Sequence, residues 1–187
     1  MRKLLLSLLL LTILLIFSGG LWLGYDVYTT GFSAKVEPHR IEVALVRQLR
    51  RLAIPNEIRD MPNPVPMSPA VLIESLEHFA DHCAICHGNN GSGETRIGKN
   101  VFPRVPDLRL EDTQSMSDGE LFFMIHNGIR FTAMPAWGEG EMDQDTGSWK
   151  LVHFIRHLRQ LTPEELDRMK SLIPKPHHDA KGGEHAH

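Results

Sequence analysis

Both cysteines of this 187-residue chain lie in one short segment, HCAICHGNNG at residues 82–91. Cys83 and Cys86 are three positions apart, and His87 follows directly. A C-x-x-C pair in a short chain is consistent with half of a zinc site, a redox-active dithiol or a disulfide. Zinc would need two further thiolate or imidazole ligands at similar spacing, and a thioredoxin-like dithiol would need a βαβ context that the sequence lacks. The histidine after the second cysteine introduces a further chemistry.

The complete pattern C-x-x-C-H is the attachment signature of c-type haem. Two thiols about one helical turn apart can form thioethers with the two vinyl groups on one edge of a porphyrin. The imidazole of the next residue then reaches the iron. On this interpretation Cys83 and Cys86 attach one haem c covalently, and His87 is its proximal ligand.

A helix is predicted to lead into the motif. Ser68 is a suitable N-cap, and Pro69 suits the first helical position. Apolar residues then recur at helical spacing, at Leu72, Leu76, Phe79 and Cys83. Glycines at positions 88, 91 and 93 end this helix, so the motif is expected at its C-terminal end.

The second axial ligand must come from the residues after the motif. The candidates are Met116, Met124, Met134, Met142, His126, His153 and His157. Met124 and His126 lie inside a predicted helix in which Ser117 and Glu120 form a capping box and Gly128 is the stop signal. A methionine at such a position is core filling.

Met134 differs because it stands in RFTAMPAWG, after the helix stop, where Pro135 favours an extended conformation. A loop methionine can turn its thioether toward the haem face that the first helix does not cover. The sequence therefore predicts Met134 as the distal ligand, with His126 as its rival.

With these features the sequence resembles the class I c-type cytochromes, small electron carriers whose haem iron is held by His and Met. The resemblance rests on Phe79 four positions before the first cysteine, CAICH at 83–87, VPDL at 105–108, MPAWG at 134–138 and SWKLVHFIRHL at 148–158. It implies an all-α cytochrome c fold around one covalent haem over residues 68–165. It also implies that the Pro106 carbonyl accepts the N–H of His87. Ser75 departs from the pattern, because many members have a glycine there.

The resemblance implies one-electron transfer between redox partner proteins of a respiratory or dehydrogenase chain. With His87 and Met134 both bound, no open position is left for a small-molecule substrate, so an electron carrier rather than an enzyme is expected. A thioether ligand and burial raise the potential relative to bis-histidine haem. The alternatives are a haem subunit of a larger oxidoreductase complex, or a peroxidase or gas sensor in which Met134 dissociates.

The N-terminus carries an apolar run from Leu4 to Leu23, behind Arg2 and Lys3. About 20 residues span roughly 30 Å as a helix, the thickness of a bilayer core. A cleaved signal peptide is the alternative, but its apolar core is shorter and it ends in a small-x-small site. Residues 1–25 are therefore predicted to anchor the chain in a bacterial cytoplasmic membrane, with the haem domain in the periplasm or an equivalent extracytoplasmic space.

Residues 26–67 are predicted to be a linker in two parts. The first, at 37–54, places Ile41, Leu45, Leu49 and Leu52 at helical spacing, with arginines on other faces. This amphipathic helix is either a strut packed on the domain or a helix lying on an anionic membrane surface. The second part is rich in proline and is expected to be an extended, semi-rigid spacer.

Residues 166–187 are charged and rich in histidine, and are predicted to form a disordered tail. His177, His178, His185 and His187 leave metal binding open, beside a purely solvated tail. The formal net charge of −3 gives no indication of a nucleic-acid partner.

Overall fold

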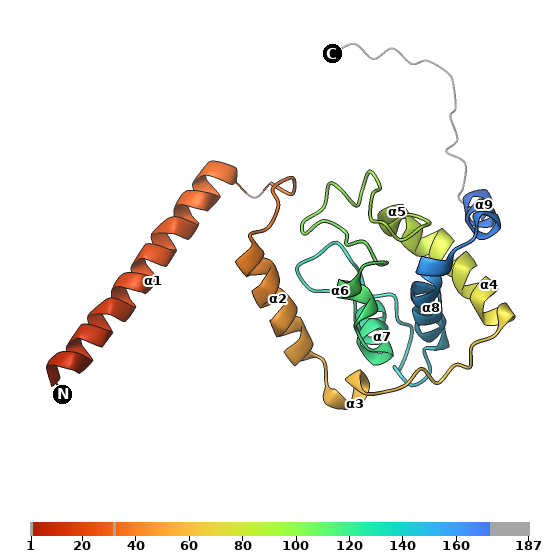
Figure 1. Cartoon of the computed structure of the whole chain (residues 1–187), viewed down its shortest axis with the longest axis horizontal. Coiled ribbons are helices and arrows are strands. Elements are labelled where there is room, and N and C mark those ends of the chain that lie inside the picture. The colour runs from red at the N-terminus through yellow and green to blue at the C-terminus, as the bar shows by residue number, and fades with distance from the viewer. Residues whose placement is uncertain (1, 32, 173–187) are drawn as a thin grey trace, which may run out of the picture. The chain divides into compact units, whose positions relative to one another are not determined.

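The computed structural model describes residues 2–31 and 33–172, which fall into two units divided after residue 37 (Figure 1). These residues form helices and loops, with no strand among them, so the predicted all-α class is confirmed. The helices are α1 (Arg2–Thr30), α2 (Arg40–Ala53), α3 (Asn56–Arg59), α4 (Pro69–His78), the π-helical turn η1 (Phe79–Cys83), α5 (Ala84–His87), α6 (Glu111–Gln114), α7 (Asp118–Asn127), α8 (Thr146–His157), the 3-10 turn η2 (Leu158–Gln160) and α9 (Pro163–Leu172).

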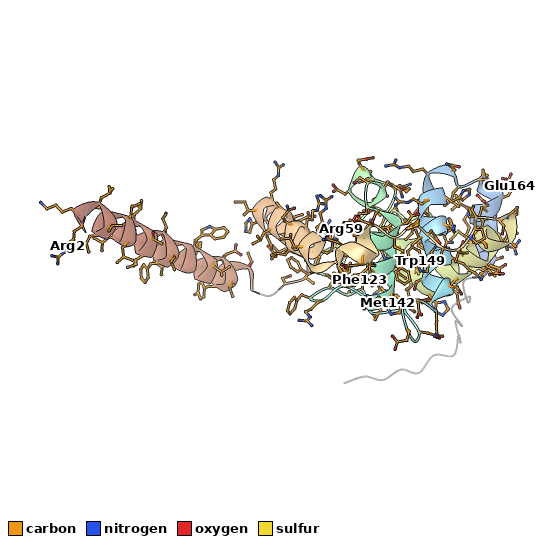
Figure 2. The ribbon with its side chains drawn as sticks, turned by 90° about the horizontal axis from the view of Figure 1, so that it is seen from below. Arg2, Arg59, Phe123, Met142, Trp149 and Glu164 are labelled. Atoms are coloured by element: carbon orange, nitrogen blue, oxygen red, sulfur yellow. The ribbon has the colours of Figure 1, made fainter. Side chains whose placement is uncertain are left out.

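The first unit is dominated by α1, whose side chains project on all sides and none of which is buried (Figure 2). At about 1.5 Å per residue its 29 residues reach roughly 44 Å. In the part of the chain that the structure describes, α1 is the one helix long and apolar enough to cross a membrane. A helix that is apolar all round suits lipid.

The core of the second unit lies where α4 packs against α8 and α8 packs against α7. The Phe79 ring lies 4.8 Å from that of Phe154, and Phe122 stacks on Trp149 at 4.1 Å. Leu76 is buried in the same cluster. The helix α8 therefore packs across Leu76 and Phe79 of the helix that leads into the motif.

The predicted helix boundaries follow from local hydrogen bonds. Ser68 Oγ accepts from Val71 N at 3.2 Å, and Pro69 occupies the first turn of α4. Ser117 and Glu120 form the capping box of α7, which Gly128 ends. The sequence did not indicate that the helix widens into the π-helical turn η1 directly before the motif, a feature frequent at functional sites.

The proline-rich segment at residues 55–67, predicted to be an extended, semi-rigid spacer, is hydrogen-bonded to α7 and α8. Asn63 Nδ2 donates to Trp149 O at 2.9 Å, and His153 Nε2 lies 2.7 Å from Val65 O. Ser117 Oγ donates to Arg59 O at 2.6 Å. Because prolines leave backbone carbonyls free of helical bonds, the segment can satisfy polar groups of α7 and α8 along its length.

The predicted tail is wrong for residues 166–172, which belong to α9. Thr162 and Glu165 exchange hydrogen bonds as a capping box, at 2.8 and 3.2 Å, and start the helix at Pro163. Met169 is completely buried. The helix therefore contacts the core, which its charged composition did not indicate. The four tail histidines and the rest of 173–187 lie outside the described residues.

Candidate functional site

The cysteine motif occupies the last turn of the helix that begins at Pro69. Cys83 ends η1, while Cys86 and His87 lie in α5. Gly88 ends the helix at φ 73°, a conformation that side chains with a Cβ rarely adopt. Both cysteines are free thiols. Burial raises the pKa of Cys83 to about 12 and also raises the pKa of Cys86, so both are neutral at pH 7.

His87 is held in the form that binds metals. Its ring centre lies 6.2 Å from that of Phe79, and its Nδ1 is buried with no hydrogen-bond partner. Burial lowers the pKa of His87 to about 4, so the imidazole is neutral at pH 7. A neutral imidazole has a free lone pair, which is what a transition metal takes from histidine.

The loop over residues 88–108 fixes the carbonyl groups at the end of the motif. Gly93 N donates to His87 O at 2.8 Å, and Thr95 Oγ1 donates to Cys86 O at 3.0 Å. A Cβ at Gly98 would lie 2.6 Å from Cys86 O, so the loop approaches too closely for any larger residue. Sequence reasoning missed these positioning residues, although the spacing of glycines after the motif was visible.

Pro106 does not make the expected bond to His87. The histidine Nδ1 has no partner, so the hydrogen bond that the resemblance implies is absent. The same loop nevertheless brings Pro106 close, since a Cβ at Gly93 would lie 3.2 Å from Pro106 O. Gly93 N also donates to His87 O, so Gly93 is bonded to His87 and lies near Pro106. The role of Pro106 toward His87 stays a prediction.

Met134 lies on a second loop, at residues 128–138, and is partly buried against the core. Its carbonyl accepts from Ile129 N at 3.1 Å, and its own N–H donates to Thr132 Oγ1 at 3.1 Å. After it, Trp137 N and Gly138 N donate to the carbonyls of Ile125 and His126, at 3.1 and 3.0 Å. The loop is therefore fastened back along the end of α7, with Met134 between its two attachments.

The rival ligand His126 is engaged elsewhere. Its Nδ1 lies 2.7 Å from Asp145 Oδ2, and the two side chains are only 10% and 7% exposed. Asp145 also caps α8 by accepting from Ser148 N at 2.9 Å. Asp145 was not predicted from the sequence, although an Asp three residues before a Ser at a helix start is a recognisable cap.

The remaining candidates have other surroundings. Met116 and Met124 are buried in the core, as predicted for Met124. His153 contacts Val65 O, and His157 lies 2.9 Å from Glu165 Oε1. Across residues 2–31 and 33–172 no three His, Cys, Asp or Glu side chains are grouped as a metal site.

Residues 74–155 match the family model described as cytochrome C oxidase, cbb3-type, subunit III. No curated protein matches the sequence. The matched range contains the motif, the loop that covers it, Met134 and most of α8. The chain therefore contains a c-type cytochrome domain, whose cofactor is haem c with its iron and whose activity is haem-based electron transfer.

The residues present fit that cofactor. Two neutral thiols stand three positions apart, and a buried neutral imidazole with an unpartnered nitrogen follows them. A thioether on a separate loop is available as a second soft ligand.

Proposed function

We propose that the chain is a one-electron carrier with a single haem c, attached through Cys83 and Cys86 and ligated by His87 and Met134. The observation that carries this proposal is the His87 imidazole, which is neutral and buried directly after two free thiols. Its unpartnered Nδ1 is the nitrogen left for the predicted bond to Pro106, so the other ring nitrogen would bind the iron. A buried polar nitrogen with no partner is rare in folded proteins and calls for a ligand or a neighbour.

Each of these residues has a distinct role. The haem iron supplies exchange of one electron between its ferric and ferrous states. Cys83 at the end of η1 and Cys86 in α5 would hold the cofactor, and His87 would offer its lone pair from the turn that contains Cys86. Met134 supplies a soft thioether, which favours the ferrous form and raises the potential. If His87 and Met134 both bound the iron, no position would be left open for a substrate.

The anchor is part of this proposal. α1 is long and apolar enough to span a bilayer, and Arg2 and Lys3 at its start favour a cytoplasmic N-terminus. The haem domain would then lie on the extracytoplasmic side, tethered near membrane-bound redox partners of a respiratory or dehydrogenase chain. Tethering raises the effective concentration of the domain at those partners.

A second candidate function is a haem subunit within a larger oxidoreductase complex. It is favoured by the family match, whose description names a subunit of an oxidase. Mild detergent extraction separates the two functions. A free carrier would migrate alone and exchange electrons rapidly with small soluble carriers, whereas a subunit would remain with its complex.

The test is the optical spectrum of the full haem-loaded chain in both oxidation states, for wild type and Met134→Ala. We expect the wild type to show the weak far-red ferric band of thioether ligation, and the variant to lose it. Met142→Ala is a matched control, because Met142 is another partly buried loop methionine. A band that survives in Met134→Ala, or wild-type reduced protein that binds carbon monoxide readily, would contradict Met134 as a stable ligand.

A further inference from the structure

Helix α2 has two unlike faces. Ile41, Leu45, Leu49 and Leu52 follow one another at helical spacing and are 83%, 58%, 56% and 75% exposed. Side chains of the membrane-spanning candidate α1 are exposed to a similar degree, for example Leu14 at 62%. We call these four residues of α2 the apolar stripe.

The opposite face of α2 is basic, and it is the one that meets the domain. Arg47 Nη2 lies 2.7 Å from Asp112 Oδ2, and Arg47 lines a cleft together with Asp112 and Met116. Arg50 is half-buried on the same side, and its charge interacts with Glu120. Ile54, just past the helix, is buried.

The structure therefore differs from the packing expected of a strut, the first of the two alternatives for this helix. A strut would pack its apolar residues on the domain and leave its arginines in water. Here Arg47 pairs with Asp112 of α6 and Arg50 is half-buried, while the four apolar side chains stay exposed. The apolar stripe is left for another partner.

Chain connectivity indicates which partner that is. α2 begins ten positions after α1 ends, and ten residues reach at most about 35 Å when fully extended. An amphipathic helix held that close to a bilayer, with leucines on one side and arginines on the other, has the composition of an interfacial helix. Arg40 and Arg51 remain exposed and available to anionic headgroups.

We propose that α2 lies in the membrane–water interface with the apolar stripe in the lipid and the basic face toward the haem domain. Glu42 stands on the lipid side but in the first turn, where it reaches the headgroup region. The inference rests on α1 being the membrane anchor of the proposed function. The inference adds that the domain contacts the bilayer through α2, and is not attached to the membrane through α1 and a free linker alone.

The test places an environment-sensitive NBD fluorophore on Leu45→Cys in the full haem-loaded chain, in vesicles of phosphatidylethanolamine and phosphatidylglycerol. Ile73→Cys is the control, because Ile73 is also an exposed aliphatic residue on a helix, α4, on the side of the unit away from α2 (Figure 1). Wild-type chain treated with the same fluorophore should stay unlabelled, which verifies that Cys83 and Cys86 are blocked by haem. We expect label 45 to show blue-shifted emission, quenching by doxyl lipid and several-fold weaker quenching by iodide than label 73.

Two results would overturn the inference. Equal iodide quenching at positions 45 and 73 would place the apolar stripe in water. Protection of label 45 from both iodide and doxyl lipid would show that protein covers the stripe, either a second copy or a partner subunit. Alkaline carbonate extraction separates these failures from failure of the anchor, since release of both labelled variants from the vesicles would contradict α1 as an anchor.

Discussion

The loop that follows the motif and the loop that carries Met134 are held by different means. On the proximal side, the motif continues a helix that packs against α8 and α9, and the loop at 88–108 binds the carbonyls of Cys86 and His87. On the proposed distal side, Met134 lies on a loop fastened by a few backbone hydrogen bonds to the end of α7. The proximal side is part of the core, whereas the distal loop is attached to it.

Because of this difference, we expect substitutions on the two sides to affect different properties of the protein. A change on the proximal side removes helix packing and cofactor attachment together, so it affects folding. A change on the distal loop alters how firmly one ligand is held, so it affects the spectrum and potential first. Four predictions test this separation.

The largest effect is expected from Cys83→Ala/Cys86→Ala. Without attachment the haem is no longer held in a domain whose core is otherwise small, so we expect loss of bound haem and of most helicity. Far-ultraviolet circular dichroism measures the helicity. Met134→Ala, which retains both thioethers, should keep its haem and helicity. Native-like helicity in the double variant would contradict the prediction.

Met169→Ala tests the part of the proximal packing that α9 provides. The side chain is fully buried, so truncation should lower the free energy of unfolding by about 2–5 kcal/mol. Denaturant unfolding followed by circular dichroism gives the value, and the far-red band should be unchanged. Leu172→Ala on the same helix is the control, because Leu172 is 38% exposed. Equal destabilisation by both variants would mean that α9 does not pack as described.

Gly128→Ala loosens the distal loop. Gly128 has φ 67°, and a Cβ there would lie 2.6 Å from the backbone of Pro135 and Ala136. We expect a cost of about 1–3 kcal/mol and easier displacement of Met134 by added imidazole, read from loss of the far-red band. Gly140→Ala is the control, because Gly140 has a similar φ of 70° but a Cβ there would meet no neighbouring atom. This variant therefore measures the cost of backbone strain alone. If both variants release Met134 equally, the close approach at Gly128 is unimportant.

Asp145→Asn is expected to have the smallest effect, about 1 kcal/mol of unfolding free energy. Burial alone would raise the pKa of Asp145, but hydrogen bonds from Ser148 and His126 outweigh it and lower the pKa below its ordinary value. The carboxylate therefore stabilises the fold above about pH 4, and this contribution is lost as pH falls through the lowered pKa. Denaturation series should show the gap between wild type and variant closing below that pH. A constant gap would contradict the charge argument.

Much of the site could be read from local sequence, because local chemistry specifies it. The caps at Ser68 and Ser117, the stop at Gly128 and the motif at 83–87 depend on residues within one or two turns. The capping box at Thr162 and Glu165 was equally local and was overlooked, because the charge of the segment suggested disorder.

Contacts between distant segments could not be read in this way. The pairing of His126 with Asp145 and the packing of residues 55–67 on α8 join positions 19 and about 90 residues apart. Hydrogen bonds of this kind depend on which surfaces meet, and no periodicity or spacing encodes that.

The sequence by itself determined the helical class, the C-x-x-C-H site, the loop position of Met134 and the amphipathic character of α2. Tertiary structure alone decided which face of α2 meets the domain. An amphipathic pattern predicts that the apolar side is buried, but in this structure Arg47 pairs with Asp112, Arg50 is half-buried and the apolar stripe is exposed. The pattern shows that two faces differ, and only the charge of the opposing surface determines which one is covered.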